Sequence, residues 1–298
     1  MRIASLLASG TELVCALGAG EELVARSHEC DDPSWVVSLP CASRPTFDIT
    51  GSSREIDALV RSRLASKQPL FEVDERLLVE LRADVILTQT HCEVCAVSPD
   101  DVGDLELCRK QVATLHAGTL DGILDGFRAV AAVIGRERAG AELVDAIRDR
   151  LDRLQQRLAG SARPTIACLE WIDPIFHMGN WGPELVELAG GTNLLGMSGA
   201  HSTTTPWDDV RRADPEILLV AACGFDVERS LREMPILAAL PGWGELRAVR
   251  AGRVFVADGN RYFNRSGPSV FESVEILAEI LHPDLVQSRH AAAWQRWS

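Results

Sequence analysis

The chain has 298 residues, of which 46% are hydrophobic and 24% are charged, so it is long enough to build two modest folded domains. Lys and Arg number 30 against 43 Asp and Glu, which gives a net charge of -13 and excludes the basic footprint of a nucleic-acid binder. No segment approaches the roughly 18 consecutive apolar residues of a membrane-spanning helix. The apolar segment at residues 3–7 is shorter than the core of a secretory signal, so we expect a cytoplasmic chain unless a signal was trimmed or the start misassigned.

Short apolar segments alternate with helical patterns in the first 118 residues. We predict strands over residues 3–7, 24–27, 85–88 and 112–115, and helices over residues 9–17, 52–64 and 74–81. Ser9 and Glu12 have the spacing of a capping box, so we expect Ser9 to cap the first helix and Gly18 to end it. Alternating strands and helices predict a parallel sheet.

Residues 119–163 have helical periodicity throughout, with two long apolar stripes that Gly135 separates. We expect Gly140 to weaken the helix there. Alternation resumes with predicted strands over residues 166–169, 217–221 and 254–257, and helices over 183–188, 207–212 and 268–281. We therefore predict an α/β fold with an N-terminal lobe (1–118), connecting helices (119–163), a C-terminal lobe (164–284) and a tail (285–298). A helical joint leaves a cleft between the lobes, where ligands often bind.

The motif Thr90-His91-Cys92-Glu93-Val94-Cys95 follows the predicted strand 85–88. Loops at the carboxyl ends of parallel strands face the ligand crevice of α/β folds. His91, Cys92 and Cys95 could hold zinc, form a redox disulfide or contact a ligand. A second pair of zinc ligands is missing from the sequence, which favours ligand contact over a structural zinc site.

Motifs of nucleophilic or nucleotide-dependent catalysis are missing as well. The sequence has no Gly-x-Ser-x-Gly elbow, no phosphate-binding Gly-x-x-x-x-Gly-Lys loop and no Gly-x-Gly-x-x-Gly after the first strand. We therefore expect a binding protein rather than an enzyme.

Aromatic residues gather in the predicted loops of the second lobe, beside Gly and Asn at strand ends. Such a surface suits a large planar ligand better than a sugar phosphate or a lone metal ion. Arg44, Arg261 and Arg265 are the candidates for meeting anionic groups on a ligand. The aromatic set comprises Trp171, Phe176, Trp181, Trp207, Phe225, Tyr262 and Phe263.

Several segments together resemble a known family. They are residues 3–13 (IASLLASGTEL), 181–191 (WGPELVELAGG), 207–210 (WDDV), 214–218 (DPEIL) and 246–254 (LRAVRAGRV). Their order along residues 2–282 resembles that of the helical-backbone substrate-binding proteins of ABC importers, which serve vitamin B12 and ferric siderophores. Residues 27–31, 91–98 and 260–265 resemble the cobalamin-binding subgroup.

This resemblance implies two Rossmann-like lobes joined by a backbone helix, with the ligand in a shallow cleft and little closure on binding. It implies an ABC permease that docks on one acidic residue per lobe, and Glu93 and Glu245 stand in the matching loops. It also makes Ser9 and Thr11 candidate ligand contacts. His91 replaces an aromatic residue of the family, which makes it a candidate axial ligand of cobalt.

We therefore expect the chain to bind cobalamin or a related corrinoid in the cleft, with no separate cofactor, no nucleic-acid partner and no membrane insertion. One alternative is a ferric-siderophore or haem-binding protein of the same fold. The other is an enzyme of corrinoid metabolism that uses Cys92 and Cys95.

Overall fold

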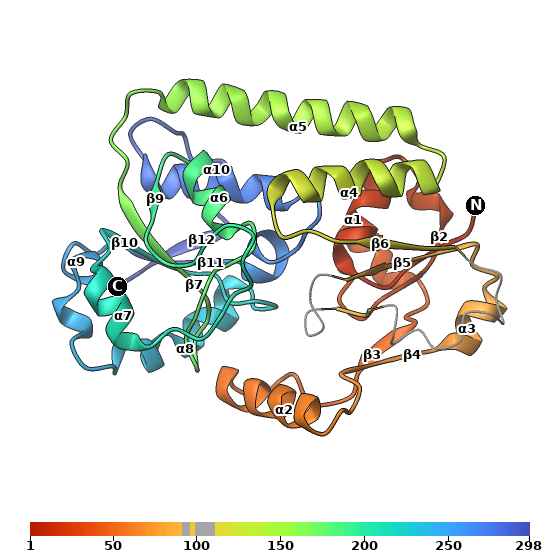
Figure 1. Ribbon diagram of the computed structural model, residues 1–298, viewed down its shortest axis with the longest axis horizontal. Coiled ribbons are helices and arrows are strands. Elements are labelled where there is room, and N and C mark those ends of the chain that lie inside the picture. The colour runs from red at the N-terminus through yellow and green to blue at the C-terminus, as the bar shows by residue number, and fades with distance from the viewer. Residues whose placement is uncertain (91–95, 99–110) are drawn as a thin grey trace. The chain divides into compact units, whose positions relative to one another are not determined.

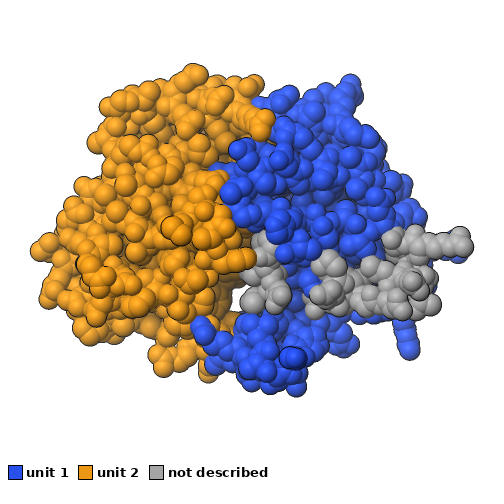
Figure 2. All heavy atoms as spheres, in the orientation of Figure 1, with its two compact units in different colours: residues 1–51, 58–146, 266–268 blue, residues 52–57, 147–265, 269–298 orange. Residues whose placement is uncertain are grey.

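The computed structural model describes residues 1–90, 96–98 and 111–298 (Figure 1). Contacts divide the chain into two compact units, which Figure 2 colours separately. Unit 1 holds residues 1–51, 58–146 and 266–268, and unit 2 holds residues 52–57, 147–265 and 269–298. The domain boundaries expected from the sequence stay predictions, because a contact unit need not coincide with a folding domain.

Unit 1 is built on a parallel sheet, as predicted. Its strands lie in the order β2 (Leu23–Arg26), β1 (Ile3–Ser5), β5 (Val85–Gln89) and β6 (Gln111–Leu115). All five residues of β5 are buried, which agrees with its apolar sequence and central position. Figure 1 shows α1 (Ala8–Ala16) and α4 (Leu120–Val133) on one side of this sheet.

The other side of the sheet packs on the pair β3 (Ser43–Pro45) and β4 (Phe71–Val73) and on α3 (Glu75–Glu80). Leu6 and Ile86 meet Phe71 and Leu78 in one buried cluster there. Two further helices, α2 (Ser53–Ala65) and α5 (Glu137–Leu158), contribute residues to both units.

The start of α1 differs from the expected capping box. The helix begins at Ala8, Leu7 is its cap residue, and no side chain caps it. Ser9 and Glu12 are buried inside the helix instead. The prediction of a Ser9 cap is therefore wrong, because the chain turns into helix directly after β1, too early for Ser9 to stand outside the first turn. Gly18, with φ of +71°, ends the helix as predicted.

Gly140 lies inside α5 and has a packing role. A β-carbon built on it would lie 2.5 Å from the Cβ of Ala131 in α4. The absence of a side chain thus lets α4 and the first turns of α5 approach closely. The sequence expectation treated Gly140 as weakening the helix, but α5 continues through it.

Unit 2 contains a mixed sheet in the order β12 (Trp294–Trp297), β11 (Val254–Ala257), β10 (Ile217–Val220), β7 (Thr165–Trp171) and β8 (Phe176–His177). β9 (Thr192–Asn193) also pairs with β7. β7, β9, β10 and β11 are parallel, whereas β8 and β12 run antiparallel at the two ends. The segment expected to be a tail therefore supplies β12, an edge strand.

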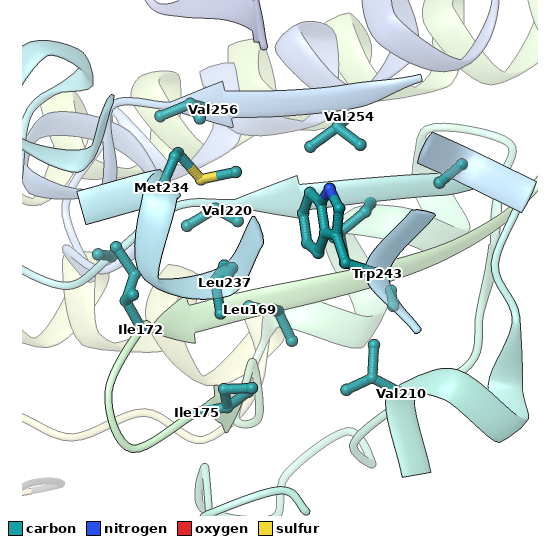
Figure 3. Packing of buried hydrophobic residues seen from close by; sticks show 14 of the residues in the cluster. Leu169, Ile172, Ile175, Val210, Val220, Met234, Leu237, Trp243, Val254 and Val256 are labelled. Atoms are coloured by element: carbon teal, nitrogen blue, oxygen red, sulfur yellow. The ribbon is translucent and has the colours of Figure 1, made fainter. Parts of the chain in front are cut away.

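Helices cover both faces of this second sheet. Figure 1 shows α6 (Gly182–Leu188) and α10 (Val270–Leu281) on one side, and α7 (Trp207–Ala213) and α8 (Val227–Ala238) on the other, where α9 (Arg247–Arg250) also packs. In Figure 3, Met234 and Leu237 of α8 meet Leu169, Val220 and Val256 of the sheet. The predicted α/β fold is confirmed, and in the described ranges no helix has the length and apolarity to span a membrane.

Candidate functional site

The carboxyl ends of the parallel strands form one edge of each sheet, here called the carboxyl edge. In unit 1, the segments at this edge are α1, which follows β1, Ser27 and His28, which follow β2, and His116, which follows β6. Ligands of α/β folds bind at this edge, because the loops that follow the strands converge there.

A buried polar cluster holds the loop after β2 in place. Thr11 donates a hydrogen bond from Oγ1 to Sγ of Cys30 (3.0 Å), and the backbone N–H of Ser27 donates to the same sulfur (3.3 Å). Thr11 is fully buried and Ser9 nearly so, with the Ser266 hydroxyl donating to the Ser9 hydroxyl at 3.5 Å. The Ser9 and Thr11 side chains thus hold the carboxyl edge in place through buried hydrogen bonds. Their predicted contact with a ligand stays a prediction.

His28 is a functional candidate that the sequence analysis did not select. Its ring is half-buried, its Nδ1 lies 2.9 Å from the Ser43 hydroxyl, and its centroid lies 5.5 Å from that of Phe71. Burial, aided by the nearby Arg26, lowers the pKa of His28 to about 4. The imidazole is therefore neutral at pH 7, the form that coordinates cobalt or iron. A histidine two residues past a parallel strand was the available signal.

Acid should destabilise the protein through His28. Its pKa is 6.5 unfolded and about 4 folded, so stability is full above pH 6.5 and declines as pH falls towards 4. The free energy of unfolding that His28 costs on acidification is about 1–2 kcal/mol, because water screens a half-buried ring. We expect His28→Gln to remove this part of the loss. The measurement is the denaturant midpoint at pH 7.5 and pH 4.5. Acid sensitivity from His177, whose pKa burial also lowers, should remain.

The control is His116→Gln, which changes an exposed imidazole at the same edge and should leave the acid sensitivity of wild type intact. If His28→Gln and His116→Gln lose equal stability on acidification, burial of His28 is not the cause.

His116 is the second imidazole at the carboxyl edge of unit 1. It follows β6, is exposed, and its Nδ1 lies 3.1 Å from the Thr90 hydroxyl. The sequence analysis did not select it, although a histidine directly after a parallel strand was the available signal. His91, Cys92 and Glu93 lie outside the described residues, so the axial role of His91 stays a prediction.

Arg44 lies in β3 and is engaged by Glu72 of β4. Its Nε and Nη2 both donate to Oε2 of Glu72, at 3.0 and 2.7 Å, and its side chain is exposed. A ligand anion would have to compete with this carboxylate for the guanidinium.

In unit 2, three predicted aromatic residues come together at the carboxyl end of β7. Trp171 ends β7, faces Phe176 across the β7–β8 pair, and its ring centroid lies 5.0 Å from that of Phe225. The Trp171 indole donates to the Ser53 carbonyl (3.2 Å), which fixes the ring, while Trp171 and Phe176 remain half-buried. We call Trp171, Phe176 and Phe225 the aromatic group.

The structure separates the other predicted aromatic residues from this group. Trp207 stacks on Trp243 at 6.0 Å, and Tyr262 lies edge-on to His290 at 6.3 Å. Trp181 and Phe263 are buried, and the Trp181 indole donates to the Phe263 carbonyl (2.9 Å). Only two of these four, Trp207 and Tyr262, therefore keep substantial exposed surface.

The cations beside the aromatic group are also engaged. The Arg229 guanidinium lies 4.5 Å from the Phe225 ring centre and donates to Oε1 of Glu233 at 3.0 Å. Arg265 is buried and donates to the Asn260 side chain at 3.0 Å. The predicted role of Arg265 as an anion contact thus requires a buried guanidinium to give up its protein partners.

Thiol chemistry finds little support at three of the described cysteines. Burial raises the pKa of Cys15 to about 11 and that of Cys168 to about 12, and it also raises the pKa of Cys30. Such thiols stay protonated and are poor nucleophiles at pH 7. Across residues 1–90, 96–98 and 111–298, no group of three His, Cys, Asp or Glu side chains could hold a metal ion. Cys92 and Cys95 lie outside those ranges.

Comparisons with known proteins agree with this architecture. The model of a family described as periplasmic binding protein matches residues 3–260. An ABC transporter substrate-binding lipoprotein of Bacillus subtilis is 21% identical over 95% of this chain and 80% of its own length. The vitamin B12-binding protein of Vibrio cholerae is 23% identical over 92% of this chain and 86% of its own.

A solved periplasmic haem-binding protein from Pseudomonas aeruginosa superposes with a TM-score of 0.74 at 19% identity, covering 100% of this chain and 99% of that chain. At this identity the likeness establishes the shared fold.

Proposed function

We propose that this chain, which belongs to the periplasmic binding protein family of ABC-importer substrate-binding proteins, binds cobalamin or a close corrinoid without changing it chemically. The family consists of binding proteins, and a relative across most of the chain binds vitamin B12. The position of the ligand relative to the two units stays a prediction.

The observation that carries the choice of ligand is that Arg44, Arg229 and Arg265 already have partners within the protein. Arg44 is bound by Glu72, Arg229 by Glu233 and Arg265 by Asn260. Ferric catecholate and ferric carboxylate siderophores and the propionates of haem are anionic and need cations that are ready to pair. A corrin carries neutral amides at its rim, so the aromatic group and a neutral imidazole suffice to meet it.

Haem binding is the second candidate, because one specific observation supports it. A neutral imidazole such as that of His28 ligates iron as readily as cobalt, and the aromatic group would stack on a porphyrin as on a corrin. The haem propionates would then have to displace a protein partner from one of the arginines. A corrinoid avoids this cost because its rim carries neutral amides.

Visible spectroscopy separates these ligands. We expect hydroxocobalamin and cyanocobalamin to bind saturably with one molecule per chain at low micromolar concentration. The hydroxocobalamin spectrum should shift as an imidazole replaces the weakly held axial water. Haemin and a ferric catecholate chelate should bind at least about tenfold more weakly, a difference of about 1.4 kcal/mol. No spectral change with either cobalamin at high micromolar concentration would overturn the proposal.

The permease contact belongs to the same proposal. Glu245 ends a short 3₁₀ turn, its side chain is 78% exposed, and its carboxylate lies 3.6 Å from Nη2 of Arg211. An exposed carboxylate so loosely held can exchange that partner for an arginine of a permease at little cost. We assign Glu245, together with Glu93, to permease docking, and the compartment in which this happens stays a prediction.

A further inference from the structure

A cavity of about 470 Å³ lies between α5, α10 and the segment 286–290 of unit 2, and His290, the ring partner of Tyr262, is the one residue of its lining named above. Its size falls within the range of small-molecule sites, about 300–1,000 Å³. Figure 1 shows α5 and α10 as neighbouring helices, and a bidentate ion pair between Arg150 and Glu275 joins them at the cavity wall.

The cavity is lined by an arginine stripe, which is unexpected in a chain with a net charge of -13. Arg150, Arg153 and Arg157 follow one another at spacings of three and four residues on α5, so they share one helix face over about 10 Å. Arg289 adds a fourth guanidinium from the segment opposite. Within the described residues, the guanidiniums of Arg153, Arg157 and Arg289 have no ion-pair partner.

The two carboxylates of the lining are already occupied. Glu275 is held by Arg150 and by Nε2 of His290, at 3.0 Å. Glu279 is buried and accepts hydrogen bonds from the backbone N–H of Arg289 (2.7 Å) and the Trp294 indole (3.1 Å). Glu279 thus fixes the segment that carries Arg289, and four arginines line the cavity with two glutamates that already have partners.

We propose that this cavity binds a small organic anion with two or more negative charges on oxyanion groups, either phosphate or carboxylate. Guanidinium forks pair with both groups in bidentate geometry. Arg153 and Arg157 lie about 6 Å apart along the helix axis and can meet two charged groups of one ligand. The site is independent of corrinoid binding and adds a second ligand class to this protein.

Calorimetry at low ionic strength tests the proposal with pyrophosphate, citrate and acetate as probes. We expect one molecule of pyrophosphate, citrate or both to bind per chain at sub-millimolar concentration, and acetate not to bind. The one that binds more tightly identifies the ligand as phosphate or carboxylate. Arg153→Ala and Arg157→Ala should each weaken binding about tenfold. Ligand should also raise the melting temperature of wild type.

The matched control is Arg148→Ala, which removes the same charge from an exposed position of α5 outside the cavity. It should leave affinity within about twofold of wild type. Arg153→Gln repeats the test with a side chain that keeps its length, and both variants should melt like wild type without ligand. The proposal is overturned if neither polyanion binds below about 10 mM, or if Arg148→Ala weakens binding as much as Arg153→Ala.

Discussion

Replacing Trp171 by alanine should weaken cobalamin binding about 30- to 100-fold, corresponding to about 2–3 kcal/mol. Trp171 is the largest half-exposed ring of the aromatic group, and its hydrogen bond to the Ser53 carbonyl holds the ring in one orientation. A fixed aromatic face loses little entropy when a planar ligand covers it, so most of its buried area contributes to affinity.

Trp207→Ala is the matched control. Trp207 is also half-buried, also packs on the core of unit 2, and also donates its indole N–H to a carbonyl, that of Pro241 at 2.8 Å. It belongs to a different cluster, with Trp243. Its loss should leave cobalamin affinity within about threefold, and Trp171→Phe should retain most of the affinity. Equal losses in Trp171→Ala and Trp207→Ala, measured by calorimetry, would show that the aromatic group is not the ligand surface.

Gly259→Ala should destabilise unit 2 by about 3 kcal/mol or more. A β-carbon at Gly259 would lie 2.2 Å from the carbonyl oxygen of Ala222 and 2.6 Å from the carbonyl carbon of Ala221. Both are backbone atoms at the end of β10, so no side-chain rotation relieves the clash. The Asn264 amide ties the same two loops by donating to the carbonyls of Ala221 (2.9 Å) and Gly259 (3.0 Å).

Gly244→Ala is the corresponding control, since a β-carbon there has no atom within 4 Å. It should change the free energy of unfolding by less than about 0.5 kcal/mol. Denaturant unfolding followed by circular dichroism measures both variants. If Gly259→Ala is as stable as Gly244→Ala, the loops after β10 and β11 are less tightly packed than described. Gly259→Ala should also weaken cobalamin binding, because Phe225 lies on the loop that the added β-carbon displaces.

Elements with strong periodicity could be predicted from the sequence. The buried strand β5, the amphipathic helices α4 and α5 and the stop at Gly18 follow from short-range patterns of apolar residues and glycine. The first helix cap was wrong because a capping-box pattern specifies which side chains could bond, while the end of β1 decides where the helix starts.

Elements that depend on distant partners could not be predicted. β12 is a strand because its backbone pairs with β11, some forty residues earlier, and nothing local marks it as one. α8 was missed, and it contains Pro235, a residue that usually argues against a helix interior. The aromatic set was predicted as one surface, but burial of Trp181 and Phe263 depends on tertiary packing that composition does not encode.

Site residues show the same division. His28 and His116 follow parallel strands, so topology could have identified them, but the low pKa of His28 arises from its burial near Phe71 and Arg26. The arginine stripe on α5 is visible in the sequence at helical spacing, yet it becomes a cavity wall only because α10 and the segment 286–290 close around it.

Native mass spectrometry of the protein mixed with equimolar cyanocobalamin, haemin and a ferric catecholate chelate tests the central claim most directly. Each ligand adds a different mass, so one spectrum reports which of them the chain selects. We predict that the main adduct is one cobalamin per chain, and that Trp171→Ala loses it while Trp207→Ala keeps it. A main adduct of haemin or of the ferric chelate, or no cobalamin adduct at all, would contradict the account.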